Sequence, residues 1–249
     1  MNTLFTGKPV KWIESLDSTN RYANIQVKNG NSTDGAVYAT HVQTNGRGQI
    51  GNKWITRHRE NLTFSVVYEP TFLAATEQFY LNMSVCLALS NFLQKECSLA
   101  AQVKWPNDIY VDYEKIAGVL IENTLRGSNL SHTVIGIGLN VNQDVFDEEL
   151  SSATSIKLKT GKEYVLEELL DTFLSYLEAE YLLLKARRFD DLYARYCANL
   201  LFFNEERVFT ANDQIFSGII TGINSDGRLI INTRAGNKLY AFKEVAFVV

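Results

Sequence analysis

The sequence predicts an α+β protein, in which a mixed, largely antiparallel sheet backed by helices is followed by a small C-terminal β-barrel. Short apolar runs bounded by turn residues indicate strands over much of the chain. Two long stretches carry apolar residues at three- and four-residue steps, which is typical of amphipathic helices. After residue 199 short strands follow one another at hairpin spacing. We therefore expect two domains, residues 1–198 and 199–249.

The first expected element is a short helix. Asp17-Ser18-Thr19-Asn20 supplies capping residues at its start, and Asn29-Gly30 supplies the usual signal at its end. Strands are predicted at residues 36–42 and 61–68, the second with apolar side chains at every other position. A polar loop with glycines, residues 44–53, lies between these two strands.

A long, well-buried helix is expected over residues 74–97, and a second over residues 166–184. Short turns join the first strands between these helices, which favours antiparallel pairing because a parallel crossover needs about a dozen residues. A shorter helix is expected at residues 190–197. The remaining strands are predicted at residues 102–105, 109–111, 116–121, 133–141, 207–210, 215–223, 229–232, 238–242 and 245–249.

Composition excludes several classes of protein. With 46% hydrophobic and 21% charged residues over 249 positions, the chain is neither disordered nor fibrous. Lys and Arg number 24 against 28 Asp and Glu, without a long cationic run, which argues against binding of DNA or RNA through charge. No apolar stretch reaches the roughly 20 residues of a membrane span, and no secretory signal is visible. We expect a soluble, cytoplasmic protein with reduced cysteines and without a zinc site, in which Cys86 and Cys97 are buried thiols of an apolar helix.

The segment from Gln43 to Trp54 packs three glycines and two cations into one loop. Glycines allow backbone N–H groups to turn towards an anion, and Arg47 can add a forked, charge-assisted contact. The loop is therefore suited to a phosphate. Taken alone, the same composition also fits a flexible hairpin tip that binds nothing.

Two further segments place polar groups beside strand glycines. The turn at Pro106-Asn107-Asp108 presents an amide and a carboxylate, and a hairpin returns Lys115 close to Asp108. Gly118 and the Gly136-Ile137-Gly138 run imply close approach of a ligand or another strand to the backbone. When each is taken alone, ordinary turn chemistry and a solvated lysine are the favoured explanations of these polar residues.

The order of these segments is more specific than any one of them. Ser18-Thr19-Asn20, then GRGxxGxxW (Gly46 to Trp54), KWPND (Lys104 to Asp108), KIAGVLIE (Lys115 to Glu122) and GIGLNVN (Gly136 to Asn142) resemble the biotin–protein ligases along essentially the whole chain. The resemblance implies the class II synthetase-like catalytic fold of that family and an SH3-like C-terminal domain. It also implies the family's reaction: ATP and biotin form biotinyl-5′-AMP, and biotin then passes to a lysine of a biotin carboxyl carrier protein.

The resemblance further implies roles for individual residues. The catalytic residues would be Lys115, Arg47 and Asp108. The residues around biotin would be Ser18, Thr19, Asn20, Gln43, Gly46, Arg47, Lys115, Gly118 and Leu120. The residues around the nucleotide would be Arg47, Gln49, Asn52, Trp54, Lys115 and Asn140. Mg²⁺ is expected to enter with ATP, and its protein ligands are not assigned.

This chain departs from the family pattern in two places. Gln49 and Asn52 stand where the family loop commonly has arginines, which predicts weaker retention of the adenylate. Because the first motif begins at Ser18, we expect a monofunctional ligase without the DNA-binding domain of the bifunctional members. A lipoate or octanoate ligase and a non-catalytic nucleotide-binding module stay as alternatives. The partners expected are biotin, ATP and the carrier protein, with a homodimer left open.

Overall fold

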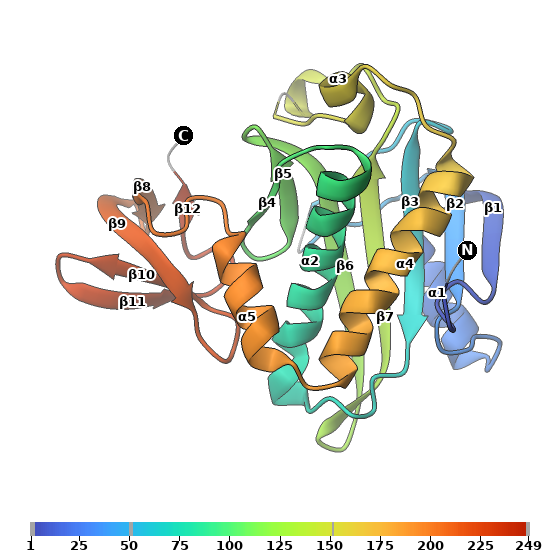
Figure 1. The fold of residues 1–249 in the computed structure, drawn as a ribbon, viewed down its shortest axis with the longest axis horizontal. Coiled ribbons are helices and arrows are strands. Elements are labelled where there is room, and N and C mark those ends of the chain that lie inside the picture. Colours follow the sequence, from blue (N-terminus) through green and yellow to red (C-terminus); the bar gives the residue numbers. More distant parts are fainter. Residues whose placement is uncertain (1–2, 50–51, 151, 248–249) are drawn as a thin grey trace.

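The protein contains two β-sheets and a layer of helices (Figure 1). In the computed structural model residues 3–49, 52–150 and 152–247 are described. Within them, one sheet has seven strands in the order β1-β2-β3-β7-β6-β5-β4, and the other has five in the order β11-β10-β9-β8-β12. The predicted α+β class is therefore confirmed.

The large sheet is antiparallel except at one edge, where β1 and β2 are parallel. The predicted antiparallel pairing of the strands on either side of the 106–108 turn is confirmed. The sequence pattern does not indicate β1, because polar residues such as Lys11 and Glu14 interrupt its apolar positions and the strand is paired on one side only. The strands are β1 (Val10–Leu16), β2 (Val37–Gln43), β3 (Asn61–Tyr68), β4 (Ala101–Lys104), β5 (Asp108–Val111), β6 (Glu114–Arg126) and β7 (Asn129–Asn140).

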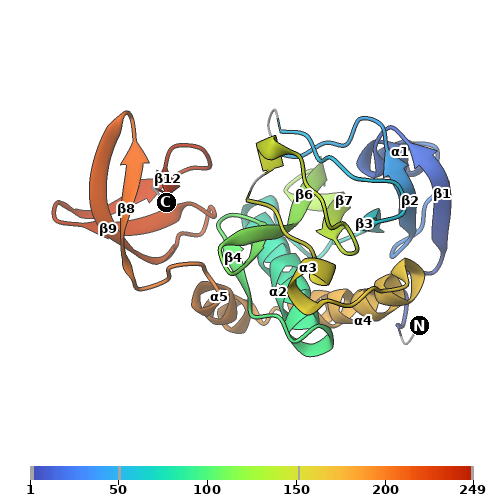
Figure 2. The same ribbon diagram turned by 90° about the horizontal axis from the view of Figure 1, so that it is seen from above.

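Three helices cover one face of this sheet, and the short first helix lies on the opposite side (Figure 2). Ser18 caps the first helix as predicted, with its side chain accepting from the Arg21 backbone N–H. None of the described helices is long and apolar enough to cross a membrane. The helices are α1 (Thr19–Lys28), α2 (Gln78–Glu96), α3 (Ile156–Thr160), α4 (Leu166–Lys185) and α5 (Phe189–Ala198), with single 3₁₀ turns at Ala75–Glu77 and Glu148–Leu150.

Strand β3 shows how the sheet separates core from site. All eight of its residues are buried, and the first six alternate between polar and apolar. Phe64 and Tyr68 face the helices, with ring centroids 5.8 Å from Phe173 and 4.0 Å from Tyr181 on α4. Because side chains alternate along a strand, Thr63 and Ser65 point to the other face. On that face, which holds α1, Val67 also joins a small apolar cluster with Ala23.

The small sheet packs beside the β4 edge of the large one (Figure 1). Trp105 donates its indole N–H to the Gly227 carbonyl at 2.9 Å, and Tyr193 on α5 donates to the Ile223 carbonyl at 3.2 Å. The proposed domain boundary at residue 198 coincides with the end of α5. The strands are β8 (Glu206–Ala211), β9 (Gln214–Ile223), β10 (Leu229–Thr233), β11 (Gly236–Tyr240) and β12 (Ala246–Phe247); the last two residues of the expected 245–249 strand lie outside the described residues.

The three cysteines are free and buried, which confirms the predicted burial of Cys86 and Cys97. Cys86, Cys97 and Cys197 have between 0% and 6% of their surface exposed. Burial raises the pKa of each thiol, because the charged thiolate is poorly solvated in an apolar interior. These residues fill core volume and are poor nucleophiles.

A buried carboxylate on α4 holds the N-terminal segment. Glu178 is 5% exposed and accepts hydrogen bonds from the backbone N–H groups of Leu4, Phe5 and Thr6. Burial by itself would raise the pKa of Glu178, but these three donors favour the charged form and the net pKa is lowered. The ionised carboxylate is therefore a stabilising group.

Replacing Glu178 by Gln should lower the free energy of unfolding by about 1–3 kcal/mol at pH 7, because charge-assisted hydrogen bonds become neutral ones. A lowered carboxyl pKa contributes stability above its unfolded value, near 4.5, and that contribution is lost as pH falls through the folded value. Urea unfolding between pH 7 and pH 3.5 should therefore show the difference between wild type and variant shrinking on acidification. Glu167→Gln, on the exposed side of the same helix, is the control. A difference that stays constant with pH would contradict this account.

Candidate active site

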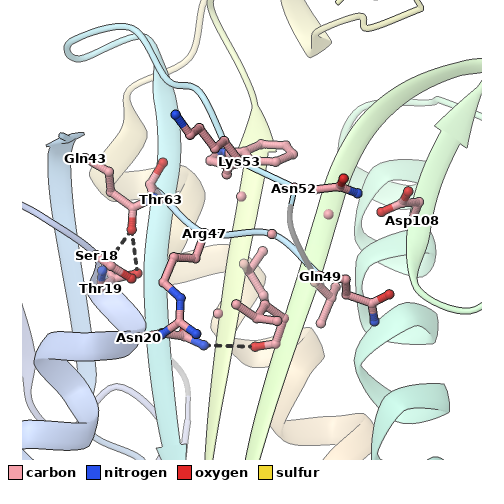
Figure 3. A pocket seen from close by; sticks show the side chains of 18 of the residues that line it. Ser18, Thr19, Asn20, Gln43, Arg47, Gln49, Asn52, Lys53, Thr63 and Asp108 are labelled. Atoms are coloured by element: carbon pink, nitrogen blue, oxygen red, sulfur yellow. Dashed lines mark hydrogen bonds between the residues drawn. The ribbon is translucent and has the colours of Figure 1, made fainter. Parts of the chain in front are cut away.

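A cleft is lined by residues from the start of α1, the loop after β2, strands β3, β5, β6 and β7, and Phe242 of the C-terminal part. It lies on the side of the large sheet that holds α1, opposite α2 and α4. The structure brings most of the predicted site residues together there (Figure 3). Those that line the cleft are Ser18, Thr19, Asn20, Gln43, Arg47, Gln49, Asn52, Trp54, Asp108, Lys115, Gly118 and Leu120.

The floor of the cleft is a row of residues that face one another across four strands. Thr63, Gly138, Gly118 and Asp108 are successive partners on β3, β7, β6 and β5. A Cβ atom at Gly138 would lie 2.1 Å from the Trp54 indole, so the indole rests directly on the backbone there. Trp54 Nε1 and Thr63 Oγ1 are buried and have no hydrogen-bond partner among the described residues. Both atoms line the cleft, where a ligand can satisfy them.

The start of α1 and the end of β2 form one wall. The Thr19 backbone N–H and hydroxyl both donate to Gln43 Oε1, at 2.8 and 3.2 Å (Figure 3). Ser65, from the polar face of β3, lies 2.8 Å from the Thr19 hydroxyl. These contacts fix the rotamers of Thr19 and Gln43 before any ligand binds.

The glycine-rich loop folds back over the cleft as a narrow hairpin. The Gly48 N–H donates to the Asn52 carbonyl, and the Trp54 N–H donates to the Gly46 carbonyl. The backbones of Arg47 and Lys53 form an antiparallel β-bridge. In Figure 3 the Arg47 side chain extends towards Asn20, while Gln49 and Asn52 lie on the side of Asp108. Gly46 itself is at the base of the hairpin and is not among the lining residues, and the absence of a Cβ there allows the Trp54 carbonyl to approach closely.

A charged pair forms the opposite wall. Lys115 Nζ is 2.7 Å from Asp108 Oδ1, which confirms the predicted return of Lys115 to the 106–108 turn. About a third of each side chain is exposed, so the pair is accessible from the cleft. The ammonium is also 5.8 Å from the centre of the Trp54 ring. Lys115 has three N–H donors, and Asp108 occupies one of them, which leaves donors for an anion in the cleft.

The turn before Asp108 is fixed from the helical layer. The Pro106 carbonyl accepts from Asn82 on α2 at 2.8 Å and from the Tyr196 hydroxyl on α5 at 2.6 Å. The Asn107 amide points inward and donates to the Val119 carbonyl at 2.6 Å. The expectation that this amide is presented beside the Asp108 carboxylate is therefore wrong, because the buried amide needs a hydrogen-bond partner and finds it in the neighbouring strand.

Asn140, which was predicted to contact the nucleotide, lies outside the cleft lining. It is 4% exposed and donates its amide to the Thr154 carbonyl at 2.9 Å. The Thr154 N–H in turn donates to the Lys115 carbonyl. The placement of Asn140 supports a role in fixing the segment beside Lys115 and not a direct contact.

Eight lining residues are absent from the predicted site: Gly48, Lys53, Thr63, Val119, Gly136, Ile137, Gly138 and Phe242. Of these, Thr63 and Phe242 lie outside every motif that the sequence analysis singles out. The alternation of β3 contains a usable signal for Thr63, since polar residues at alternate positions of a buried strand mark a second, polar environment. Phe242 belongs to the chain after β11, and only the docking of the small sheet brings it to the cleft. No local sequence pattern identifies such a residue.

Comparison with known proteins agrees with this geometry. Residues 12–140 match the profile of the Biotin/lipoate A/B protein ligase family. A structure of biotin protein ligase from Aquifex aeolicus in complex with biotin and ATP superimposes with a TM-score of 0.80, at 28% identity, over 97% of this chain and 99% of that chain. Because the family profile covers more than half of the sequence, the chain belongs to the Biotin/lipoate A/B protein ligase family.

Two curated relatives extend over nearly the whole sequence. The biotin–[acetyl-CoA-carboxylase] ligase of Paracoccus denitrificans is 28% identical, over 93% of this chain and 97% of that protein. The bifunctional ligase/repressor BirA of Bacillus subtilis is 25% identical, over 97% of this chain and 75% of that protein. Similarity to biotin ligases therefore includes the small sheet as well as the large one.

Substitution by a larger residue should disturb the hairpin more at Gly46 than at Gly48. A Cβ at Gly46 would lie 2.2 Å from the Trp54 carbonyl oxygen, whereas at Gly48 the nearest atom is 3.2 Å away on the Asn52 side chain. Gly46→Ala should open the hairpin and speed tryptic cleavage after Arg47 and Lys53 several-fold, with little change in global thermal unfolding. Gly48→Ala is the matched control. Equal cleavage rates in the two variants would show that this contact does not hold the loop.

Proposed function

We propose that this chain is an ATP-dependent biotin–protein ligase, which forms biotinyl-5′-AMP and transfers biotin to a lysine of a biotin carboxyl carrier protein. The observation that carries the proposal is a cleft with a glycine floor and cations from two separate elements, Arg47 from the loop and Lys115 beside Asp108. The relatives with biotin ligase activity in their names, and the related structure with biotin and ATP, support it.

Biotin would lie along the floor of the cleft. Ser18, Thr19 and Gln43 supply hydroxyl and amide groups at one end, which suit the donors and acceptors of the ureido ring. The absence of side chains at Gly118 and Gly138 leaves flat backbone for the apolar rings and the valeryl chain. The biotin carboxylate then extends towards the charged wall at Lys115.

In the first step a biotin carboxylate oxygen attacks the α-phosphorus of ATP, and the bond from that phosphorus to the pyrophosphate oxygen breaks. Two anions must approach each other, and negative charge grows on the phosphoryl oxygens. Three cations line the cleft, Arg47, Lys53 and Lys115, against the single carboxylate of Asp108 among the described lining residues. Preorganised charge of this kind lowers the barrier because it needs no rearrangement during the reaction. ATP would enter as its magnesium complex.

In the second step a lysine amine of the carrier attacks the acyl carbon of the mixed anhydride, and AMP leaves. The attacking amine has to be neutral, so it loses a proton before or during the attack. Asp108 is at the open side of the cleft and is a third exposed, which suits a role in positioning the amine. We place the reaction in the cytoplasm, where thiols such as those of this chain stay reduced.

Lys115→Ala should reduce biotin-dependent ATP–pyrophosphate exchange by about 10²–10³-fold, since it removes one electrostatic donor to the charge that grows at the phosphate. The fold should persist, because the side chain is partly exposed and its backbone bonds remain. Circular dichroism and thermal unfolding provide the control for folding. Exchange at the wild-type rate by a folded variant would remove Lys115 from the mechanism.

Gln49→Arg combined with Asn52→Arg should slow dissociation of biotinyl-5′-AMP. Both positions line the cleft on the Asp108 side, so added cations there would face the phosphate. Off-rates of the adenylate are compared between the two proteins at one ionic strength. Lys238→Arg, a conservative change on β11, is the control variant. An unchanged or faster off-rate in the double variant would show that these side chains do not reach the phosphate.

The family also includes lipoate ligases, and one assay separates the alternatives. Pyrophosphate exchange into ATP is measured with biotin, with lipoate and with neither acid. Exchange that depends on biotin alone is the expected result. Exchange with lipoate, or the absence of exchange with either acid, would support a lipoate ligase or a non-catalytic module instead.

A further inference from the structure

Glu122, the last residue of the KIAGVLIE segment, is next to the cleft but is not among its lining residues. Its carboxylate Oε1 lies 3.4 Å from Arg47 Nη2. Arg47 comes from the glycine-rich hairpin and Glu122 from β6, so this ion pair joins the loop to the sheet. The Glu122 side chain is 29% exposed and that of Arg47 is 52% exposed.

The carboxylate is held in place from α1. Glu122 Oε2 accepts from the side-chain amides of Asn20 and Asn24, each at 3.0 Å. Two amide donors on one oxygen fix the carboxylate plane and leave Oε1 directed at Arg47. Glu122 is therefore an anchored anion, unlike a mobile surface glutamate.

The orientation of Asn20 is fixed in turn. Its amide donates to the Leu120 carbonyl at 3.2 Å as well as to Glu122, and its oxygen is 2.6 Å from the Ser65 hydroxyl. A Cβ at Gly136 would be 2.2 Å from Asn20 Oδ1, so the oxygen occupies the space that this glycine leaves. A continuous polar chain thus runs from Ser65 through Asn20 and Glu122 to Arg47.

This chain of contacts leaves Arg47 available to a substrate. A guanidinium has five N–H donors, and the 3.4 Å separation from Glu122 is longer than a tight bidentate pair. Arg47 is half exposed on a loop with three glycines, and without an anchor its side chain would populate many rotamers. Glu122 restrains the guanidinium over the cleft without occupying all of its donors.

We propose that Glu122 is a positioning residue, which holds the Arg47 guanidinium over the cleft so that it is preorganised for the carboxylate and phosphate groups of the substrates. The effect on catalysis rests on the proposed ligase function, whereas the ion pair that restrains Arg47 is present in the ligand-free protein. Loss of the carboxylate charge frees Arg47, and substrate binding then has to restrict that side chain again.

The test is Glu122→Gln, which keeps the shape and one acceptor oxygen but removes the charge. Glu14→Gln is the matched control, because Glu14 also pairs with an arginine, Arg59 at 2.7 Å, on strand β1 outside the cleft. In the ligand-free proteins, Glu122→Gln should speed tryptic cleavage after Arg47, whereas Glu14→Gln should not. With biotin, Glu122→Gln should raise KM about threefold to fivefold, the size expected for a partly exposed ion pair.

A double-mutant cycle with Arg47→Ala separates positioning from a general structural effect. In the Arg47→Ala background, Glu122→Gln should have no further effect on biotin affinity measured by calorimetry. An unchanged or lower KM in the single variant, or an equal loss in both backgrounds, would overturn the proposal. If the wild-type chain shows no biotin-dependent exchange, the ligase function fails, and the tryptic comparison still decides whether Glu122 restrains Arg47.

Discussion

The close packing of the Trp54 indole on the backbone of Gly138 is the contact on which the site depends. Any side chain at Gly138 would occupy the position of the indole. With the indole in place, the loop after β2 lies along the sheet, and its polar residues form the roof of a cleft instead of extending into solvent. The glycines of β6 and β7 thus determine how deep the cleft is and how close to the sheet the loop after β2 lies.

The two faces of the large sheet follow from one rule, the alternation of side chains along a strand. On the helical face, apolar residues of β3 pack against α2 and α4 and form the main hydrophobic core. On the other face the same strand presents two hydroxyl groups, of which that of Ser65 is hydrogen-bonded to Thr19 and Asn20 of α1. A buried polar group without a hydrogen-bond partner is costly. Thr63 Oγ1 has no such partner among the described residues, so it marks a position where a ligand can form a hydrogen bond.

The positions proposed to be catalytic are supported by distant parts of the chain. The turn that carries Asp108 is held by α2 and α5 through the Pro106 carbonyl and by the small sheet through Trp105. The small sheet also contributes Phe242 to the cleft wall. The site is therefore a product of three packed layers, and a change in the docking of any one of them would move the charged wall relative to the loop.

The sequence by itself determined the fold class and most helices and strands, because hydrophobic period and turn residues are local signals. The pairing of Lys115 with Asp108 follows from a short hairpin, and most other residues of the cleft were predicted from the order of motifs that resembles the biotin–protein ligases. Only the tertiary structure decided that Asn140 turns to Thr154, that Asn107 points inward, that Phe242 reaches the cleft and that Glu122 meets Arg47. Those contacts join segments far apart in the chain, and which partner a polar side chain finds depends on how the layers pack, which no local pattern encodes.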